Sequence, residues 1–282
     1  MQGLQAVSLV FSPVGFTHAN EVQMDLDASG LLGSQAQSVD LSADEKAITL
    51  GHPSYVWRRG QDRRLNLIRE HVPLESKRIL DIGCGLGMYV EKFRGFSDEV
   101  YGVDIDPDKV RQAQERLPNI SLSPAEELPF KDRSFDVAML HEVIEHVVDD
   151  RRAVAEAMRI LDVGGHLVIY APNRLYPFET HGCFFRGSYH FGVVPLVNYL
   201  PDPLRDRVCP HVRIYTARGI KRLFDGIPVR FVAFTHIYPG FDNIVATRPG
   251  LGRFLQRTTD MLERTPLRAF GISHFVVAQR LA

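Results

Sequence analysis

Cysteine is scarce in this chain, and neither charge is in excess. The 3 cysteines are an odd number at irregular positions, which argues against a disulfide framework and favours a reducing compartment. The 33 basic and 34 acidic side chains give a net charge of -1, so the composition offers no electrostatic reason to expect a nucleic-acid partner. Together these observations predict a cytoplasmic protein that does not bind nucleic acid.

Long apolar runs are also missing. No stretch approaches the length of a membrane span. Residues 6–16 are mildly apolar, but they lack a basic start and a convincing cleavage site, so they are not predicted to be a signal peptide. With 45% hydrophobic and 24% charged residues, the composition is ordinary for a globular enzyme of one domain, with or without a cap.

Composition and periodicity divide the chain into four segments. Residues 1–50 are rich in small polar residues and are expected to be loosely ordered. Residues 51–172 alternate apolar strands with amphipathic helices, which requires a parallel, doubly wound α/β sheet. Residues 173–215 are dense in Pro, Gly, His and aromatics without a clear period, and we expect a substrate-side insertion or cap. Residues 216–282 are expected to complete the sheet.

The elements can be bounded from the hydrophobic pattern. The expected strands are residues 78–82, 100–103, 120–122, 135–140, 167–170, 229–235 and 274–279. The expected helices are residues 53–72, 88–93, 151–161, 216–224 and 251–262, with a further helix that begins at Pro107 after an Asp106 cap. We expect Gly164 and Gly165 to end the helix over residues 151–161.

The run from Ile79 to Gly87 is the most informative part of the chain. An apolar strand ends in Asp81, and glycines follow at positions 83, 85 and 87. Glycine permits a positive φ and a close approach of ligand to backbone N–H groups at the start of a helix. Nicotinamide-binding folds would place the third glycine at position 88, which is Met88, so a nicotinamide reductase is disfavoured.

Asp81 and the G-x-G-x-G spacing resemble motif I of class I S-adenosylmethionine (SAM) methyltransferases. Asp104 ends the next strand about 20 residues later, where an acid can accept hydrogen bonds from ribose hydroxyls. The residues AEELPF at 125–130 and SFDV at 134–137 are similar to a block of the ubiquinone/menaquinone-type (type 11) methyltransferases. In that family an acid commonly precedes the alanine and receives the adenine amino group. Here Pro124 stands there, so this contact is missing or is taken over by Glu126.

The resemblance implies a Rossmann-like, seven-stranded sheet that is mostly parallel with an antiparallel last strand, plus a cap. It implies SAM as cofactor and an acceptor that is a small or lipid-linked molecule, methylated on oxygen. The residues that the resemblance brings to the cofactor are Asp81, Gly83, Cys84, Gly85, Gly87, Asp104, Ile105, Ala125, Glu126 and His141. Pro124 is the only sequence feature that favours a SAM-binding protein without catalytic activity.

Residues 141–146, HEVIEH, follow the fourth strand of the core and therefore point into the ligand crevice. Glu142, Glu145 and His146 would share one face of a helical turn, with donors suited to a divalent cation. The pattern is similar to the metal-binding segment of quinone O-methyltransferases and small-RNA 2′-O-methyltransferases. A role of His146 as pocket wall or base is favoured over a metal site, and the near-neutral charge speaks against metal-assisted RNA methylation.

The insertion supplies further polar candidates. Asn173, Glu179 and His181 lie just beyond the fifth strand and could contact the acceptor, or they could belong to a rigid loop in which polar groups satisfy one another. We expect His146, Glu142 and His181 to act as base or to orient the acceptor. The pairs His181/Cys183 and Cys209/His211 have one intervening residue each, which is tighter than zinc ligands usually show, so no zinc site is expected.

Two apolar stretches and an arginine run have alternative interpretations. Residues 193–200 and the helix over residues 251–262 hint at an apolar acceptor. The helix also carries Arg253, Arg257 and Arg264, and this basic amphipathic character can mean a membrane-surface contact, although ordinary packing of both stretches is favoured. The arginines at positions 58, 59, 63 and 64 could clamp an anion, but a solvated helix face is favoured. Tyr55 and Trp57 could close over the cofactor. Nothing in the sequence predicts the oligomeric state.

Overall fold

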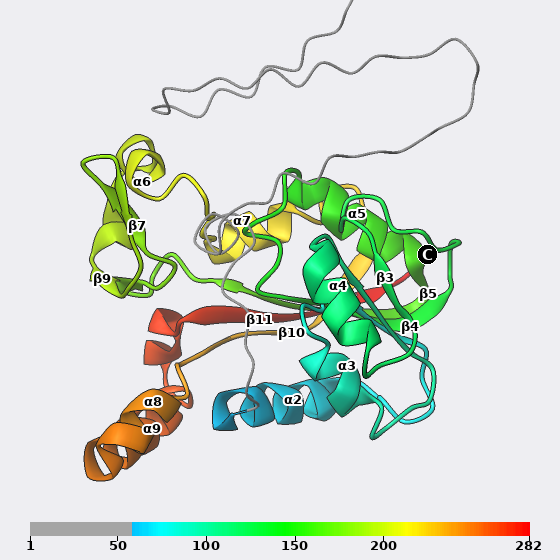
Figure 1. Ribbon diagram of the computed structural model, residues 1–282, viewed down its shortest axis with the longest axis horizontal. Coiled ribbons are helices and arrows are strands. Elements are labelled where there is room, and N and C mark those ends of the chain that lie inside the picture. The colour runs from blue at the N-terminus through cyan, green and yellow to red at the C-terminus, as the bar shows by residue number, and fades with distance from the viewer. Residues whose placement is uncertain (1–57) are drawn as a thin grey trace, which may run out of the picture.

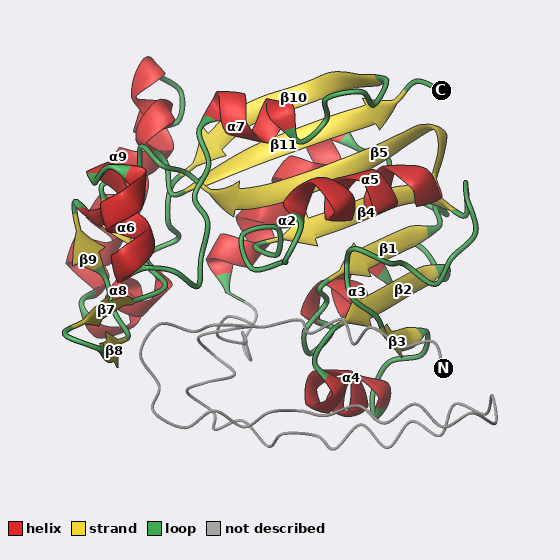
Figure 2. Cartoon of the chain, turned by 90° about the horizontal axis from the view of Figure 1, so that it is seen from above, coloured by secondary structure: helices red, strands yellow, loops and turns green. Residues whose placement is uncertain are grey.

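The computed structural model describes residues 58–282. The segment expected to be loosely ordered, residues 1–50, and the aromatic pair Tyr55 and Trp57 therefore lie outside the described residues. At the centre is a seven-stranded sheet with the order β10-β11-β5-β4-β1-β2-β3 (Figures 1 and 2). Its strands are β1 (Ile79–Ile82), β2 (Val100–Asp104), β3 (Ile120–Leu122), β4 (Phe135–His141), β5 (Leu161–Pro172), β10 (Val229–Ile237) and β11 (Ser273–Arg280).

Strand direction confirms the expected topology. β1 pairs in parallel with β2 on one side and β4 on the other, whereas β11 runs antiparallel to both β5 and β10. The chain moves outward from β1 to β3 and then returns to β4 on the opposite side of β1. The carboxyl ends of β1 and β4 therefore meet where the strand order reverses, which is the usual ligand crevice of such sheets.

Helices cover both faces of the sheet (Figure 2). One buried apolar cluster includes side chains of α5 and α7, and a second includes those of α2, α3 and α4. Because the central strands are buried on both faces, they are almost continuously apolar. The helices are α2 (Arg59–His71), α3 (Met88–Phe93), α4 (Pro107–Gln114), α5 (Asp150–Ile160), α6 (Asp202–Val208), α7 (Ala217–Arg222), α8 (Asp242–Thr247) and α9 (Pro249–Leu262), with 3-10 turns η1 (Val197–Tyr199) and η2 (Pro266–Phe270).

Local capping explains where several helices begin. Asp106 caps α4 by accepting a hydrogen bond from the Asp108 N–H at 2.9 Å, and Pro107 occupies the first helical position, as the sequence predicts. Thr216 likewise caps α7 through the Gly219 N–H at 3.0 Å. These caps fix the residues at which α4 and α7 begin.

The expected end of the fourth core helix is wrong. α5 ends at Ile160, and Gly164 and Gly165 lie inside β5 instead of terminating the helix. The pairing register between β4 and β5 shifts at this point, and Gly164 has a φ of 83°. The glycines therefore allow a bulge in a strand, a role that the pattern of a helix followed by a glycine pair does not distinguish from a helix end.

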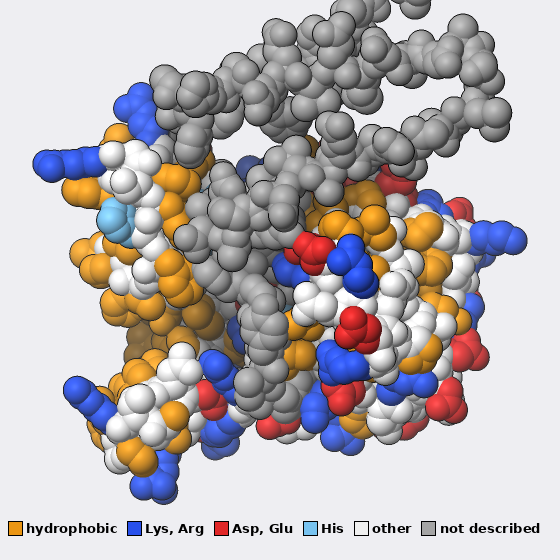
Figure 3. Space-filling model, viewed as in Figure 1, with side chains coloured by type: hydrophobic (Ala, Val, Ile, Leu, Met, Phe, Trp, Pro, Cys, Tyr) orange, Lys and Arg blue, Asp and Glu red, His pale blue; other side chains and the backbone are white. Residues whose placement is uncertain are grey.

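The cap, residues 173–215, contains more regular structure than its sequence indicated. It holds β6 (Phe178–Glu179), β7 (Cys183–Phe185), β8 (Ser188–His190) and β9 (Val194–Pro195), in two small antiparallel sheets, together with η1 and α6. Its own small core contains Cys183, Val197, Cys209 and Val212. The cap projects from the end of the main sheet and carries many apolar side chains on its surface (Figures 1 and 3).

The segment between β10 and β11 forms a second projection at that same end (Figure 1). α8 and α9 pack against each other there, and η2 leads back into β11. None of the helices between residues 58 and 282 combines the length and hydropathy needed to span a bilayer.

Candidate functional site

The glycine turn after β1 is held by the neighbouring strand. The N–H groups of Gly83 and Cys84 both donate to the Val103 carbonyl, at 2.8 and 2.9 Å. Gly83, Gly85 and Gly87 all have positive φ, so each position favours glycine. A Cβ at Gly83 or Gly87 would collide with a neighbouring side chain, whereas no atom lies within 4 Å of a Cβ built at Gly85. The turn is therefore tight on its core side and open at Gly85.

Two buried acids stand behind this turn. Asp104 accepts a hydrogen bond from the Gly85 N–H at 2.7 Å and one from the Asp106 N–H at 2.9 Å. Asp81 is 2% exposed, and burial together with the nearby Asp104 charge raises the pKa of its carboxyl well above the usual range. The Asp104 carboxylate thus links the end of β2 to the turn after β1, and the buried Asp81 carboxyl lies close to it.

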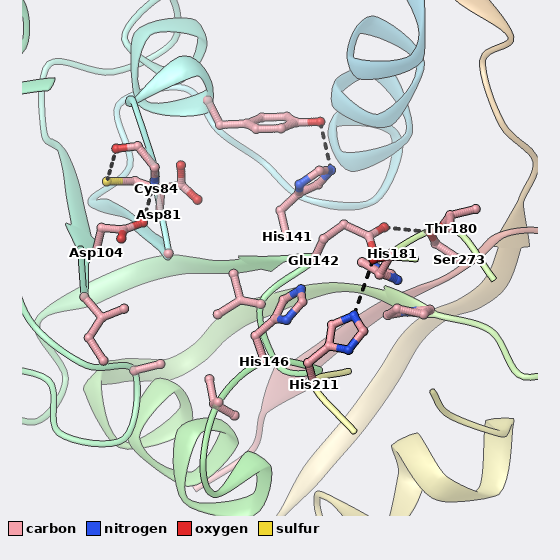
Figure 4. Close-up of a pocket in the computed structure, with 18 of the residues that line it drawn as sticks. Asp81, Cys84, Asp104, His141, Glu142, His146, Thr180, His181, His211 and Ser273 are labelled. Carbon is pink, nitrogen blue, oxygen red and sulfur yellow. Dashed lines mark hydrogen bonds between the residues drawn. The ribbon is translucent and has the colours of Figure 1, made fainter. Parts of the chain in front are cut away.

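Both acids and the turn line one large cavity of about 890 Å³ (Figure 4). A volume of this size suits a cofactor together with a small acceptor. The cavity extends from the carboxyl ends of β1 and β2, past the end of β4, to the underside of the cap. All thirteen candidate cofactor and catalytic residues line it except Gly87, which lies behind the turn: Asp81, Gly83, Cys84, Gly85, Asp104, Ile105, Ala125, Glu126, His141, Glu142, His146 and His181.

Beyond Asp104, the cavity wall combines apolar side chains with one carboxylate. Ile105 is 54% exposed although it is a large aliphatic side chain, and Ala125 forms part of the wall. Glu126 accepts hydrogen bonds from the N–H groups of Val148 and Asp149, at 2.8 and 3.3 Å. This carboxylate therefore fixes the loop before α5 while it borders the cavity.

His141 closes the floor of the cavity at the end of β4. Its Nε2 lies 3.3 Å from the Tyr89 hydroxyl, and its ring packs between the rings of Tyr89 and Tyr170 at centroid distances of 4.7 and 5.2 Å. Burial lowers the pKa of His141 to about 3. His141 is therefore a neutral, well-packed side chain.

Glu142 is already engaged by other side chains. Its Oε1 accepts hydrogen bonds from the Ser273 hydroxyl at 2.6 Å and from Arg64 at 3.2 Å. Burial alone would raise the pKa of Glu142, but the Arg64 charge and the Ser273 hydroxyl hold it below its usual value. The residue also has a φ of 55°, a strained conformation for a side chain other than glycine, of the kind that clusters at functional sites.

Glu145 and His146 are buried beside Glu142. Glu145 is 1% exposed, and neither of its carboxylate oxygens has a hydrogen-bond partner among the described residues. Burial and the neighbouring Glu142 charge raise the pKa of Glu145 well above its usual value. Burial, aided by His181, lowers the pKa of His146 to about 4. Burial therefore disfavours the charged form of both groups, and His146 is neutral at neutral pH.

The cap places His181 opposite His146 (Figure 4), with ring centroids 5.5 Å apart. His181 Nδ1 lies 2.9 Å from Glu179 Oε1, and Arg205 donates to Glu179 Oε2 at 2.7 Å. Glu179 and Arg205 are only 1% and 2% exposed. Burial opposes ionisation of Glu179, but His181 and Arg205 lower its pKa to about 2. A buried, ionised carboxylate thus orients the His181 ring.

The residues that could hold a cation differ from those that the sequence grouped. One ligand atom each from Glu145, His146 and His181 lie within 4.8 Å of one another, and Glu142 is not part of this set. Among residues 58–282, neither Cys183 nor Cys209 belongs to such a cluster. Their sulfur atoms are 2.8 Å apart in the core of the cap, away from a shared site with histidine.

Several site residues were not predicted. Ser273 comes from β11, and nothing in its sequence context indicates that it faces Glu142. Arg205 belongs to a short helix that has the polar sequence of a surface element. The arginine run at the start of α2 is solvated only in part. Arg58 and Arg59 are exposed, but Arg59 and Arg63 form ion pairs with Asp260, Arg63 also with Glu263, and Arg64 reaches Glu142.

Comparison with known proteins places the similarity in the sheet. Residues 80–169 match a family described as a methyltransferase domain. A probable S-adenosylmethionine-dependent methyltransferase of Mycobacterium tuberculosis is 34% identical over 102 residues, which are 36% of this chain and 37% of that protein. Ubiquinone biosynthesis O-methyltransferase of Thiobacillus denitrificans is 30% identical over 118 residues, which are 39% of this chain and 51% of that enzyme.

A solved structure extends the likeness to the whole fold. The crystal structure of an S-adenosylmethionine-dependent methyltransferase from Mesorhizobium loti aligns with 76% of this chain and 96% of its own length, with a TM-score of 0.54 and 19% identity. Together with the strand order, this likeness confirms the expected Rossmann-like fold. The family match ends at residue 169, so the cap and the α8–α9 projection lie outside it.

Proposed function

We propose that this protein transfers the methyl group of SAM to an oxygen atom of a small or lipid-linked acceptor. The support is the match of residues 80–169 to a methyltransferase domain and the likeness to SAM-dependent methyltransferases of class I. The observation that carries the proposal is the joint between β1 and β2. Asp104 bonds the N–H of Gly85 at 2.7 Å, so an acid and an open glycine turn face one cavity together. This is the arrangement in which such sheets bind a ribose-containing cofactor.

The residues of this half of the cavity fit SAM. Asp104 retains lone pairs that can accept hydrogen bonds from ribose hydroxyls. Ile105 and Ala125 offer an apolar wall for the adenine, and the open space at Gly85 admits the amino-acid part close to the backbone. Asp81 lies beneath that part, where a nearby ammonium group would favour ionisation of its carboxyl. When bound, SAM supplies an electrophilic methyl group.

The other half of the cavity supplies a base and an orienting group. Since Glu179 Oε1 accepts the Nδ1 proton of His181, Nε2 is left as an acceptor. We assign His181 Nε2 as the base that removes the proton of an acceptor hydroxyl, with Glu179 stabilising the resulting imidazolium. His146, neutral and adjacent, completes the wall against which the acceptor lies. Glu142 orients this wall through its bonds to Ser273 and Arg64.

Oxygen is favoured as the reacting atom because a hydroxyl gains most from such a base. The printed function of the Thiobacillus denitrificans relative, an O-methyltransferase, supports the same choice. The proposal includes a cytoplasmic location, for which the support is the small and odd number of cysteines in the sequence.

The first experiment is a calorimetric titration of the protein with SAM and S-adenosylhomocysteine. Asp104→Ala is expected to weaken both affinities by about 10- to 100-fold, because a hydrogen bond to a charged group contributes about 1.5–3 kcal/mol. Asp106→Ala is the matched control, since Asp106 is also a buried acid that accepts a backbone N–H but does not line the cavity. Equal affinity in the wild type and Asp104→Ala would contradict the cofactor site.

Binding then justifies a screen of acceptors, in which formation of S-adenosylhomocysteine is measured. Quinols, phenols and lipid-linked sugars are the first classes to test. A SAM-binding protein without catalytic activity would leave the cofactor unchanged with every acceptor. Slow turnover with one class would instead define the acceptor.

Metal-assisted transfer is the second candidate, and the unpartnered Glu145 carboxylate favours it. A carboxylate and two imidazoles suit Zn²⁺ or Mn²⁺, and such an ion would lower the pKa of an acceptor hydroxyl. Loss of turnover in a chelator, restored by one of these ions in the wild type but not in Glu145→Gln, would support this route. Unchanged turnover in the chelator would eliminate it. If the acceptor were RNA, binding would weaken steeply with salt.

A further inference from the structure

Two segments at one end of the sheet carry most of the exposed large apolar side chains of the described chain. They are the cap and the α8–α9 projection, which lie on the same side of the molecule in both ribbon views (Figures 1 and 2). The space-filling view shows apolar atoms over both projections, with Lys and Arg at their tips (Figure 3). The most exposed of these side chains, each at least 61% exposed, are Phe185, Phe191, Val193, Leu196, Phe254 and Met261.

An ordinary surface helix buries its apolar side, whereas α9 buries polar residues and exposes apolar ones. Its buried residues are Gly252, Gln256 and Thr259. A Cβ at Gly252 would lie 2.6 Å from Val245 of α8, and Gln256 donates to the Gly240 carbonyl at 2.6 Å. The fully buried residues of the helix are therefore a glycine and two polar residues, whereas Leu255 and Leu262 are only partly buried.

The opposite side of α9 presents an apolar stripe to solvent. Leu251, Phe254 and Met261 follow helical spacing and are 46%, 64% and 61% exposed. The base of the cap is joined to the turn after this helix, because the Asn173 amide donates to the carbonyls of Ala269 and Gly271, at 2.8 Å each. The stripe and the cap thus belong to one connected face.

The charges around this stripe are strongly one-sided. Asp260 and Glu263 are engaged in ion pairs with arginines of α2, and Asp242 accepts a hydrogen bond from the Gly60 N–H. Five arginines of the same segment are exposed, and none forms an ion pair with a residue in 58–282: Arg248, Arg253, Arg257, Arg264 and Arg268. The face therefore combines exposed apolar side chains with unpaired positive charge.

We propose that α9 and the apolar surface of the cap bind the surface of an anionic lipid bilayer. A helix with an apolar stripe bordered by arginines is suited to lie in the plane of the headgroups, with its apolar side chains among the acyl chains. Anionic headgroups complement the unpaired arginines, which an apolar protein partner or a second copy of this arginine-rich face would not do.

The cavity reaches the surface close to this face. Phe178 lines the cavity and is 40% exposed, so one wall of the opening belongs to the cap. If the proposed methyl transfer is correct, an acceptor held in a bilayer could enter past Phe178 with its tail still among the lipids. The inference then selects a lipid-linked or membrane-dissolved acceptor over a freely soluble one.

Vesicle co-sedimentation of the full chain, without SAM, tests the membrane surface. We expect binding to mixed phosphatidylcholine and phosphatidylglycerol vesicles that exceeds binding to phosphatidylcholine alone and weakens as salt is added. Phe254→Ser with Met261→Ser should lower the partition coefficient by about ten-fold. Arg253→Glu with Arg257→Glu should remove the preference for the anionic vesicles.

Two controls distinguish binding through this surface from nonspecific adsorption to vesicles and from the proposed methyl transfer. Leu122→Ser changes a side chain that is 56% exposed at the far edge of the sheet and should bind vesicles as the wild type does. Asp104→Ala should also bind vesicles normally, so failure of the cofactor site would leave this inference intact. Absence of binding to either vesicle, or equal binding by the Phe254/Met261 variant, overturns it. So does a dimer, detected by light scattering, that the same substitutions dissociate.

Discussion

In the half of the cavity that we assign to the cofactor, the wall is formed by the glycine turn and by two carboxylates at the ends of β1 and β2. In the half that we assign to the acceptor, it is formed by titratable side chains: His146 after β4 and His181 from the cap. Asp104 bonds two backbone N–H groups, whereas His181 depends on a second side chain, Glu179, which in turn depends on Arg205.

This difference suits a cavity in which the sheet binds a constant cofactor and an inserted segment binds an acceptor that can vary. Backbone groups at strand ends are positioned by the sheet itself, and they serve any acceptor that uses the same cofactor. Side chains carried by an inserted segment can change without disturbing that sheet. Substitutions in the two halves should therefore separate cofactor affinity from turnover.

The largest expected effect is on turnover, from His181→Ala. Removing the assigned base should lower the rate of S-adenosylhomocysteine formation by about 100- to 10,000-fold with an acceptor found in the screen. SAM affinity should stay unchanged, because His181 lies in the acceptor half. His190→Ala, which removes an exposed histidine of the same cap, is the control and should retain full turnover. A parallel loss of SAM affinity would contradict the separation.

Blocking the glycine turn should act on the cofactor alone. Gly85→Val combines a positive φ with a side chain placed in the open cavity, and we expect at least about 30-fold weaker SAM binding, equivalent to about 2 kcal/mol. Gly187→Val is closely matched, since Gly187 also has a positive φ and open space around its Cβ position but lies on a cap hairpin. The two variants should lose similar stability, about 1–2 kcal/mol. Equal SAM affinity in both would count against the cofactor half.

Glu179→Gln should affect the acceptor half and the stability of the cap together. Turnover is expected to fall about ten-fold, because the imidazolium of His181 loses its counter-charge. Unfolding free energy should fall by about 3 kcal/mol, since Arg205 keeps a buried charge without its partner. Asp202→Asn, which disrupts the exposed ion pair with Arg174, should cost less than about 1 kcal/mol. Unchanged turnover in Glu179→Gln would remove Glu179 from the mechanism.

The smallest effect concerns the apolar wall at Ile105. Ile105→Ala should weaken SAM binding by about three- to ten-fold, which corresponds to the partial loss of one aliphatic contact. Leu122→Ala alters a side chain of similar exposure at the end of β3 that does not line the cavity, and calorimetry should give the wild-type affinity. A change of the same size in both variants would show that the effect is not local.

The turn after β1 and its partner Asp104 could be predicted from the sequence because their signals are local. A strand, an acid and three glycines within nine residues specify one turn, and Asp104 follows at a fixed distance along the chain. The strand order also follows from the βα alternation. The bulge at Gly164 and Gly165 was missed because glycine pairs end helices and kink strands alike.

The acceptor half was only partly predictable. His181 was found by its position after the fifth core strand, but the pair that supports it, Glu179 and Arg205, is 26 residues apart and carries no periodic signal. Ser273, which meets Glu142, is 131 residues away from it in the chain. The cap strands are two or three residues long, too short for any period to be recognised.

The two ends of the cap meet at a single point. The Arg174 N–H donates to the Tyr215 carbonyl, and the Tyr215 N–H donates to the Pro172 carbonyl, at 2.9 and 3.0 Å. The chain therefore enters and leaves the insertion at adjacent positions of the fold. If the proposed division of the cavity is correct, a different insertion at this position would change the acceptor while the sheet keeps the cofactor site.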